Sequence, residues 1–172
     1  MKQTIFLSAI ATVLYTAAPA HAQARSGIGV GVETTVTSEL VAPYPGVATL
    51  TYDTGVFQIE GLLTFISYDN NVTYLGAGGK FWYGIHRGER SDFSVGGGLA
   101  IINTNPDGPG DSATDFHLEG GAKIRAFLTP NVALSTTLGL GIVIADNDGP
   151  NDDVFGIAGN LLGSVGLSYY FW

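Results

Sequence analysis

One pattern constrains this chain more than any other: apolar and small side chains alternate every two residues over most of its length. Near the start, Ile28, Val30 and Val32 alternate with Gly29 and Gly31. A period of two is that of a β-strand, whose successive side chains point to opposite faces. The pattern recurs along the chain and predicts eight strands, at about 27–33, 47–53, 57–65, 75–83, 93–101, 116–128, 134–144 and 155–171.

The composition of the second face decides where the apolar face points. Glycine supplies 25 of the 172 residues, and charged residues make up only 13%. A water-soluble sandwich fills its solvent face with Lys, Glu and Thr rather than with glycine. The chain therefore predicts large side chains pointing outward into lipid and small ones pointing inward. Because lipid offers no water to free backbone groups, such a sheet closes into a barrel, and eight strands leave a lumen just wide enough for side chains.

The connections between the predicted strands differ in length. Short connections follow the second, fourth and sixth strands, and longer, turn-rich segments follow the first, fifth and seventh. Short turns at one end and long loops at the other are typical of a membrane-spanning barrel, with both chain ends on the side of the short turns. The short connections are 53–55, 86–91 and 129–131, the long ones are 38–46, 103–113 and 145–153, and 68–71 is a short exception.

The N-terminal segment has the composition of a secretory signal peptide. Lys2 precedes an apolar stretch over residues 5–15, and Ala20-His21-Ala22 fits a small-residue cleavage site. The apolar stretch is too short for a membrane helix. We therefore expect residues 1–22 to be removed and residues 23–172 to form the barrel.

Charge and cysteine content exclude several functions. The formal charge of the whole chain is −8, and it becomes −9 without Lys2, since every acidic residue lies beyond the leader. Such a chain has no basic face for nucleic acid. The absence of cysteine excludes a disulfide scaffold, a cysteine nucleophile, a thiolate metal site and a lipoprotein anchor.

The C-terminal segment carries the most specific signal. Gly166 follows the polar residue Ser164 by two positions, and two aromatic residues, Tyr169 and Phe171, lie at alternate positions near the end. With the strand pattern, this segment resembles the small eight-stranded bacterial outer-membrane barrels of the OmpA and OmpX kind. It departs from them in one respect, because Trp172 follows the last aromatic residue.

The resemblance implies an all-β, eight-stranded, antiparallel, up-and-down transmembrane β-barrel in the outer membrane of a Gram-negative cell envelope. It also implies export through the Sec pathway and the periplasm, and recognition of the C-terminal segment by the outer-membrane assembly machinery. We expect a monomer without a cofactor, in contact with outer-membrane lipids and lipopolysaccharide.

Charged residues of inward parity fall at heights that can be estimated along the strands. Glu60 and Lys80 are expected at one level on neighbouring strands, as an opposite-charge pair. Three acids and three bases sum to zero, and unpaired buried charges are costly, so we predict an ion-pair network that plugs the lumen. A gated proton or ion path is the alternative. The predicted network comprises Glu33, Glu60, Lys80, His117, Glu119, Lys123 and Arg125.

Residues of outward parity are expected to contact lipid. A belt is predicted to include Ile28, Val30, Ile59, Leu63, Leu75, Leu99, Leu118, Ile142 and Leu161. An aromatic girdle at the periplasmic rim, where amphipathic rings prefer to lie, is predicted to include Tyr52, Tyr83, Phe93, Tyr169 and Phe171.

Seven of the fifteen acidic residues are expected in two outer loops. Oxygen-rich loops of this kind could bind Ca²⁺ or bridge to lipopolysaccharide phosphates, but the spacing is wrong for an EF-hand, and solvated loops are the preferred interpretation. The two predicted clusters are Asp107, Asp111 and Asp115, and Asp146, Asp148, Asp152 and Asp153.

No catalytic site emerges from the pattern. Some small outer-membrane barrels deacylate lipid A with a lipid-facing His, Ser and acid, but here His117 has inward parity and is followed two residues later by Glu119 rather than serine. We expect a barrel that is not an enzyme, with a structural or surface-interaction role through its acidic loops. A narrow channel for small or hydrophobic solutes is the alternative function, ahead of a lipid-modifying enzyme.

Overall fold

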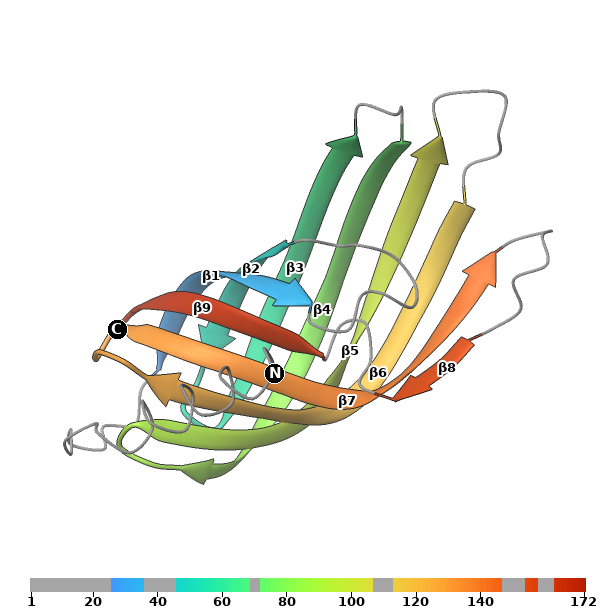
Figure 1. The fold of residues 1–172 in the computed structure, drawn as a ribbon. Coiled ribbons are helices and arrows are strands. Elements are labelled where there is room, and N and C mark those ends of the chain that lie inside the picture. Colours follow the sequence, from blue (N-terminus) through green and yellow to red (C-terminus); the bar gives the residue numbers. More distant parts are fainter. Residues whose placement is uncertain (1–25, 36–45, 69–71, 107–112, 147–153, 158–162) are drawn as a thin grey trace, which may run out of the picture.

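The computed structural model describes residues 26–35, 46–68, 72–106, 113–146, 154–157 and 163–172. The predicted signal peptide lies outside these residues. Figure 1 shows long strands that wrap around a common axis. The strands are β1 (Gly27–Thr35), β2 (Val47–Asp53), β3 (Phe57–Tyr68), β4 (Val72–Arg87), β5 (Ser91–Pro106), β6 (Ala113–Phe127), β7 (Val132–Asp146), β8 (Val154–Ile157) and β9 (Ser164–Phe171).

The strand pairing closes the sheet. Each strand from β1 to β7 pairs antiparallel with the next along the chain, and β9 pairs with both β1 and β7. A closed sheet has no free edge, which is the condition for a β-protein in lipid. The predicted fold, an eight-stranded antiparallel up-and-down barrel, is confirmed.

The last predicted strand differs from the expectation, because it is two segments. Both β8 and β9 pair with β7, which makes nine strands in eight barrel positions. On β7, Leu140 pairs with Ile157 of β8, and Thr136 pairs with Val165 of β9. A step of four residues along β7 therefore corresponds to a step of eight residues from β8 to β9. The continuous strand predicted for 155–171 is therefore wrong: extra residues interrupt the ladder, and an alternation pattern does not reveal such an interruption.

The strands differ in length, and this gives the barrel its shape. β4 and β5 have 16 residues each, whereas β1 has 9, β2 has 7 and β9 has 8. A tilted strand of about 9–11 residues is enough to cross a bilayer. In Figure 1, β3 to β7 accordingly extend well past β1, β2 and β9 at the end opposite the C-terminus.

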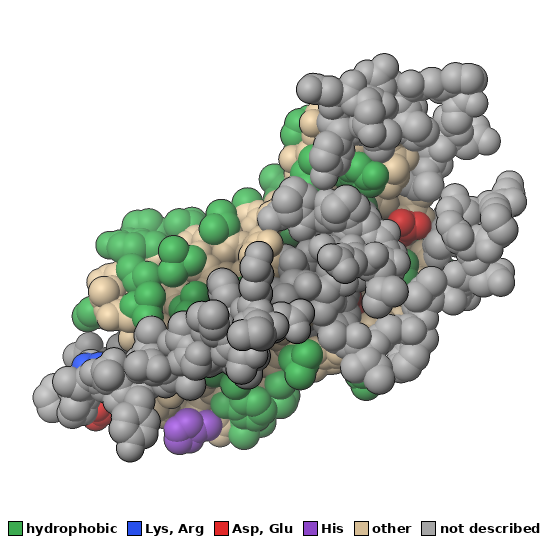
Figure 2. Space-filling model, viewed as in Figure 1, with side chains coloured by type: hydrophobic (Ala, Val, Ile, Leu, Met, Phe, Trp, Pro, Cys, Tyr) green, Lys and Arg blue, Asp and Glu red, His purple; other side chains and the backbone are tan. Residues whose placement is uncertain are grey.

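The outer wall is apolar. Predicted belt residues are exposed on it, with Leu99 and Leu118 each 59% exposed. Figure 2 shows hydrophobic side chains over most of the visible outer face of the described strands. The outward placement is confirmed for Ile28, Val30, Ile59, Leu63, Leu75, Leu99, Leu118 and Ile142, and for Tyr52, Tyr83, Phe93, Tyr169 and Phe171, whereas Leu161 lies outside the described residues.

Candidate functional site in the barrel lumen

The end of the lumen near the short turns is filled by a cluster centred on Arg125. Its guanidinium group binds Asp92 through two hydrogen bonds, from Nε (3.0 Å) and from Nη2 (2.6 Å). Nη2 also donates to Asp53 (2.7 Å), and Nη1 donates to the Tyr170 hydroxyl (2.7 Å). The residues come from β2, β5, β6 and β9, so one side chain links strands around the whole barrel. We call Arg125, Asp53, Asp92, Tyr170, Arg87 and Gln58 the lower cluster.

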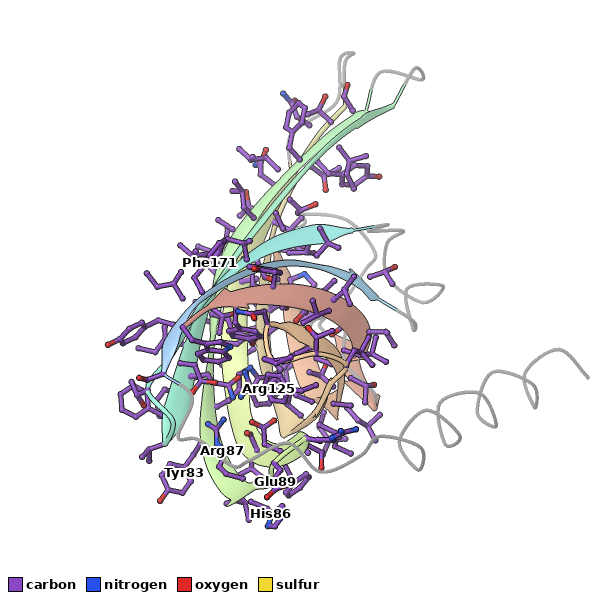
Figure 3. All side chains as sticks on the ribbon, turned by 90° about the vertical axis from the view of Figure 1, so that its left-hand side faces the viewer. Tyr83, His86, Arg87, Glu89, Arg125 and Phe171 are labelled. Atoms are coloured by element: carbon purple, nitrogen blue, oxygen red, sulfur yellow. The ribbon has the colours of Figure 1, made fainter. Side chains whose placement is uncertain are left out.

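Arg87 and Gln58 complete the lower cluster. The Nη1 of Arg87 donates to Asp92 at 2.7 Å and to Asp53 at 3.4 Å. The amide oxygen of Gln58, oriented to suit its neighbours, accepts from Arg125 at 2.7 Å and from Arg87 at 3.2 Å. Figure 3 shows Arg87 beneath Arg125 within the barrel, towards the end where His86 and Glu89 lie.

Local structure brings Asp53 and Arg87 to this cluster. Gly55 has a φ of 83°, a conformation that favours glycine, and its amide donates to the Asp53 carboxylate at 2.9 Å. A register shift between Gly84 and His86 changes the parity of β4, so that Arg87 turns inward. The sequence pattern placed Arg87 in a turn and Asp53 at the boundary between a strand and a turn, and neither was among the predicted lumen residues.

The C-terminal residues close the lower cluster. Tyr170 is buried and its ring stacks on that of Trp172, with centroids 4.8 Å apart and planes at 6°. The Trp172 indole donates to the carbonyl of Pro130 at 2.8 Å. Trp172, which departs from the resembled pattern, is thus packed against the barrel.

A second cluster lies deeper in the lumen. The Glu60 carboxylate forms an ion pair with Lys123 and accepts a hydrogen bond from the Trp82 indole at 2.8 Å. The Lys123 ammonium also lies 5.7 Å from the centre of the Trp82 ring. Glu60, Lys123 and Trp82 are buried, so their charges and polar atoms are satisfied within the protein.

A neighbouring ion pair joins β4 to β1. Lys80 donates to Glu33 at 2.6 Å, and the Ser164 hydroxyl donates to the same carboxylate at 3.1 Å. Ser164 in turn lies 2.7 Å from the Thr137 hydroxyl. The middle cluster, as we call it, consists of Glu33, Glu60, Lys80, Trp82, Lys123, Thr137 and Ser164.

The structure places all seven predicted lumen residues inside, each at most 6% exposed. Their pairing differs from the expectation. Glu60 and Lys80 are cross-strand partners, yet Lys80 binds Glu33 and Glu60 binds Lys123. The expected direct pair of Glu60 with Lys80 is therefore wrong, because the long side chains of a narrow barrel reach across the lumen rather than along the ladder.

The expected charge balance of zero is also wrong. Asp53, Asp92 and Arg87 join the six charges counted from the sequence, so among the described residues five buried carboxylates face four basic groups in the lumen. Of the lower cluster only Arg125 was predicted, because the other three charged members, Asp53, Arg87 and Asp92, lie next to turns. Trp82 and Tyr170 have inward parity in the sequence, and that signal could have identified them.

Directly above the middle cluster lies a row of uncharged, mostly apolar residues around His117. Leu62, Gly78, Ala100, His117 and Val143 are successive cross-strand partners on β3 to β7. The four besides Gly78 are at most 7% exposed. Neither ring nitrogen of His117 has a hydrogen-bond partner.

The acidic outer loops are only partly described. Asp115 belongs to β6 and is half-buried, and Asp146 is the last residue of β7, so placing these two residues in outer loops is wrong: both strands are longer than their alternating apolar parts. Asp107, Asp111, Asp148, Asp152 and Asp153 lie outside the described residues. In the described ranges no group of three or more His, Asp or Glu side chains is arranged to hold a metal. No helix in the same ranges is long and apolar enough to cross a membrane.

The C-terminal pattern occupies both faces of β9. Ser164 and Gly166 point into the barrel, and Tyr169 and Phe171 point outward, 47% and 57% exposed. The alternation of the segment thus matches its place in the wall, with Tyr170 as the inward residue between the two aromatics.

No protein-family model matches this sequence, and no curated protein matches it. Two solved structures are similar in fold. Neisserial surface protein A (NspA) is 12% identical with a TM-score of 0.44, and the match covers 85% of this chain and 94% of that protein. The Yersinia pestis outer membrane protein Ail in a phospholipid bilayer nanodisc is 14% identical with a TM-score of 0.41, over 85% of this chain and 98% of that protein.

Proposed function

We propose that this protein is an integral barrel of the bacterial outer membrane whose lumen is closed, and that it serves a structural or surface-interaction role rather than transport or catalysis. The membrane part of the proposal rests on an apolar outer wall around a polar interior, which is the inverse of a soluble protein. The wall includes Leu63, Leu99 and Leu118, each more than half exposed.

The two ion-pair clusters carry the proposal of a closed lumen. Arg125 connects side chains from four strands in the lower cluster, and Lys123 and Lys80 bind carboxylates across the middle cluster. These side chains are buried and paired, so an ion passing through would have to break several charge-assisted hydrogen bonds. An eight-stranded barrel has no spare width beside such side chains.

A surface role is supported by the arguments against transport and catalysis and by the lengths of the strands. β3 to β7 are longer than a bilayer crossing requires, so their far ends project beyond the apolar wall. Among the residues that the structure describes, His117 points inward and no outward-facing group of His, Ser and an acid supports lipid chemistry. We therefore assign contact with other molecules at the cell surface to this projecting end.

Planar-bilayer recording tests the closed lumen against the alternative of a narrow channel. Wild-type protein should insert without steady conductance. A variant with Lys123→Ala and Arg125→Ala removes one cation from each cluster and should leak, whereas Arg90→Ala, in the turn between β4 and β5, should stay silent. Steady conductance of the wild type would show an open path and overturn the proposal.

A further inference from the structure

His117 is a buried group that neither cluster uses. Its side chain is 2% exposed and both ring nitrogens lack a hydrogen-bond partner. A buried polar group without a partner is rare in native structures and calls for an explanation. Its cross-strand partners are Ala100 on β5 and Val143 on β7, so the ring lies in an apolar row.

Few charged groups face this ring. On its own strand Asp115 and Glu119 have the same inward parity, each about 7 Å along the strand from His117. Glu119 leans over β7, because a Cβ built on Gly141 would lie 3.0 Å from its Oε1. The inward residues next to the ring on β5 and β7 are uncharged.

The charged groups of the middle cluster engage one another. Lys80 of β4 is bound to Glu33 of β1, and Glu60 of β3 is bound to Lys123. Neither ring nitrogen has a hydrogen-bond partner among the described residues, so a positive charge on His117 would gain such a partner only by rearrangement. An unpaired buried charge is costly, so a charged ring favours an arrangement in which it reaches a carboxylate or water.

We propose that His117 is a proton-sensitive switch in the upper lumen, whose protonation loosens the ends of β5, β6 and β7 that project beyond the membrane. Histidine is the side chain whose charge ordinarily changes between about pH 5 and 8. A charged ring turns toward Asp115 or Glu119 and leaves its packing against Ala100 and Val143. Acid would thereby alter the exposed end of the barrel while both ion-pair clusters below stay closed.

Amide hydrogen exchange of the refolded full chain in lipid nanodiscs tests the switch. Between about pH 7.5 and about pH 5, protection factors corrected for intrinsic exchange should fall at the upper ends of β5 to β7, by up to about tenfold per pH unit. His117→Gln should abolish this fall. His86→Gln is the matched control, since His86 is exposed near the turn at the other end, and it should behave as wild type.

Two results would overturn the proposal: unchanged wild-type protection across this pH range, or the same acid-induced loss in His117→Gln. If the glutamine variant does not refold, ¹⁵N NMR spectra of the His117 ring in the wild-type protein test the proposal instead. A His117 ring signal that moves with the loss of protection supports the switch, and a ring signal that does not change over the range contradicts it.

Discussion

At the residue scale, position 125 requires the shape of an arginine side chain as well as its positive charge. Its planar group makes two bonds to Asp92 and reaches Asp53 and Tyr170 at the same time. A lysine carries the same charge but has no fork and cannot satisfy these three partners together. The geometry of the guanidinium group therefore holds the lower cluster together.

Arg125→Lys should lower the free energy of unfolding by about 2 kcal/mol, because charge-assisted bonds to buried partners are lost. Urea unfolding of the refolded barrel in lipid vesicles, followed by tryptophan fluorescence, measures this. Arg90→Lys, in the turn between β4 and β5, is the control and should change stability little. Equal stability of Arg125→Lys and wild type would refute the assigned role.

The Glu60–Lys123 pair makes a prediction about paired and unpaired charge. Lys123→Met leaves a buried carboxylate without its cation and should cost about 3–5 kcal/mol. Lys123→Met combined with Glu60→Gln should cost less than the single change, since no unpaired charge remains. The same unfolding assay compares them, and a double variant less stable than the single would argue against a buried pair.

At the scale of elements, the inward glycines of β5 explain how large side chains fit a narrow lumen. Gly96 lies opposite Trp82, and Gly98 lies opposite Lys80. A Cβ built on Gly96 would collide with the Phe81 carbonyl oxygen, and one on Gly98 would lie 2.8 Å from the Lys80 Cγ. These positions need glycine because the neighbouring strand approaches closely.

Gly96→Ala should therefore destabilise the barrel by about 1–3 kcal/mol through overpacking between β4 and β5. Gly61→Ala is the matched control, because its Cβ would meet nothing closer than the Leu50 carbonyl oxygen at 3.9 Å. The control should change stability by less than about 0.5 kcal/mol. Comparable losses for the two variants would contradict the close approach at Gly96.

The sequence pattern was sufficient for seven of the eight predicted strands, but it did not reveal the separation of β8 from β9 or the side-chain pairs across the lumen. Alternation predicted the strand at 47–53 and the outward side of residues such as Leu99 and Leu118, because parity is a local property. Lys80 pairs with Glu33 because of the stagger between the strands of the closed barrel, and no local sequence pattern encodes this stagger. Asp53 has the inward parity of Thr49 and Thr51 and could have been identified from the sequence, whereas Arg87 enters the lumen through a register shift that parity counting cannot follow.

At the scale of the whole molecule, closure distinguishes a barrel from an open sheet. The joint is made by β9, which is only 8 residues long and pairs with both β1 and β7. Two hydrogen bonds add links on this side of the barrel: Arg125 donates to Tyr170, and Trp172 donates to the carbonyl of Pro130. The closed form should therefore resist unfolding by cold detergent as a single unit.

We expect heat-modifiable migration on a gel. The unheated protein should run as a compact band and the boiled protein as an unfolded one, because the closed barrel excludes detergent from its backbone hydrogen bonds. Identical migration of heated and unheated samples would count against a closed barrel. Trp172→Ala should convert at a lower temperature than wild type, since it removes the stacking on Tyr170.

Cysteine accessibility tests the central claim most directly, because the chain has no cysteine of its own. Ser94 and Val95 are neighbours on β5, 2% and 39% exposed, with opposite directions. In proteoliposomes, a spin label on Val95→Cys should collide with oxygen dissolved in lipid and not with a water-soluble nickel complex, and Ser94→Cys should resist a charged thiol reagent. Relaxation of the Val95 label by nickel would place the wall in water, and rapid modification of Ser94→Cys would show an open lumen.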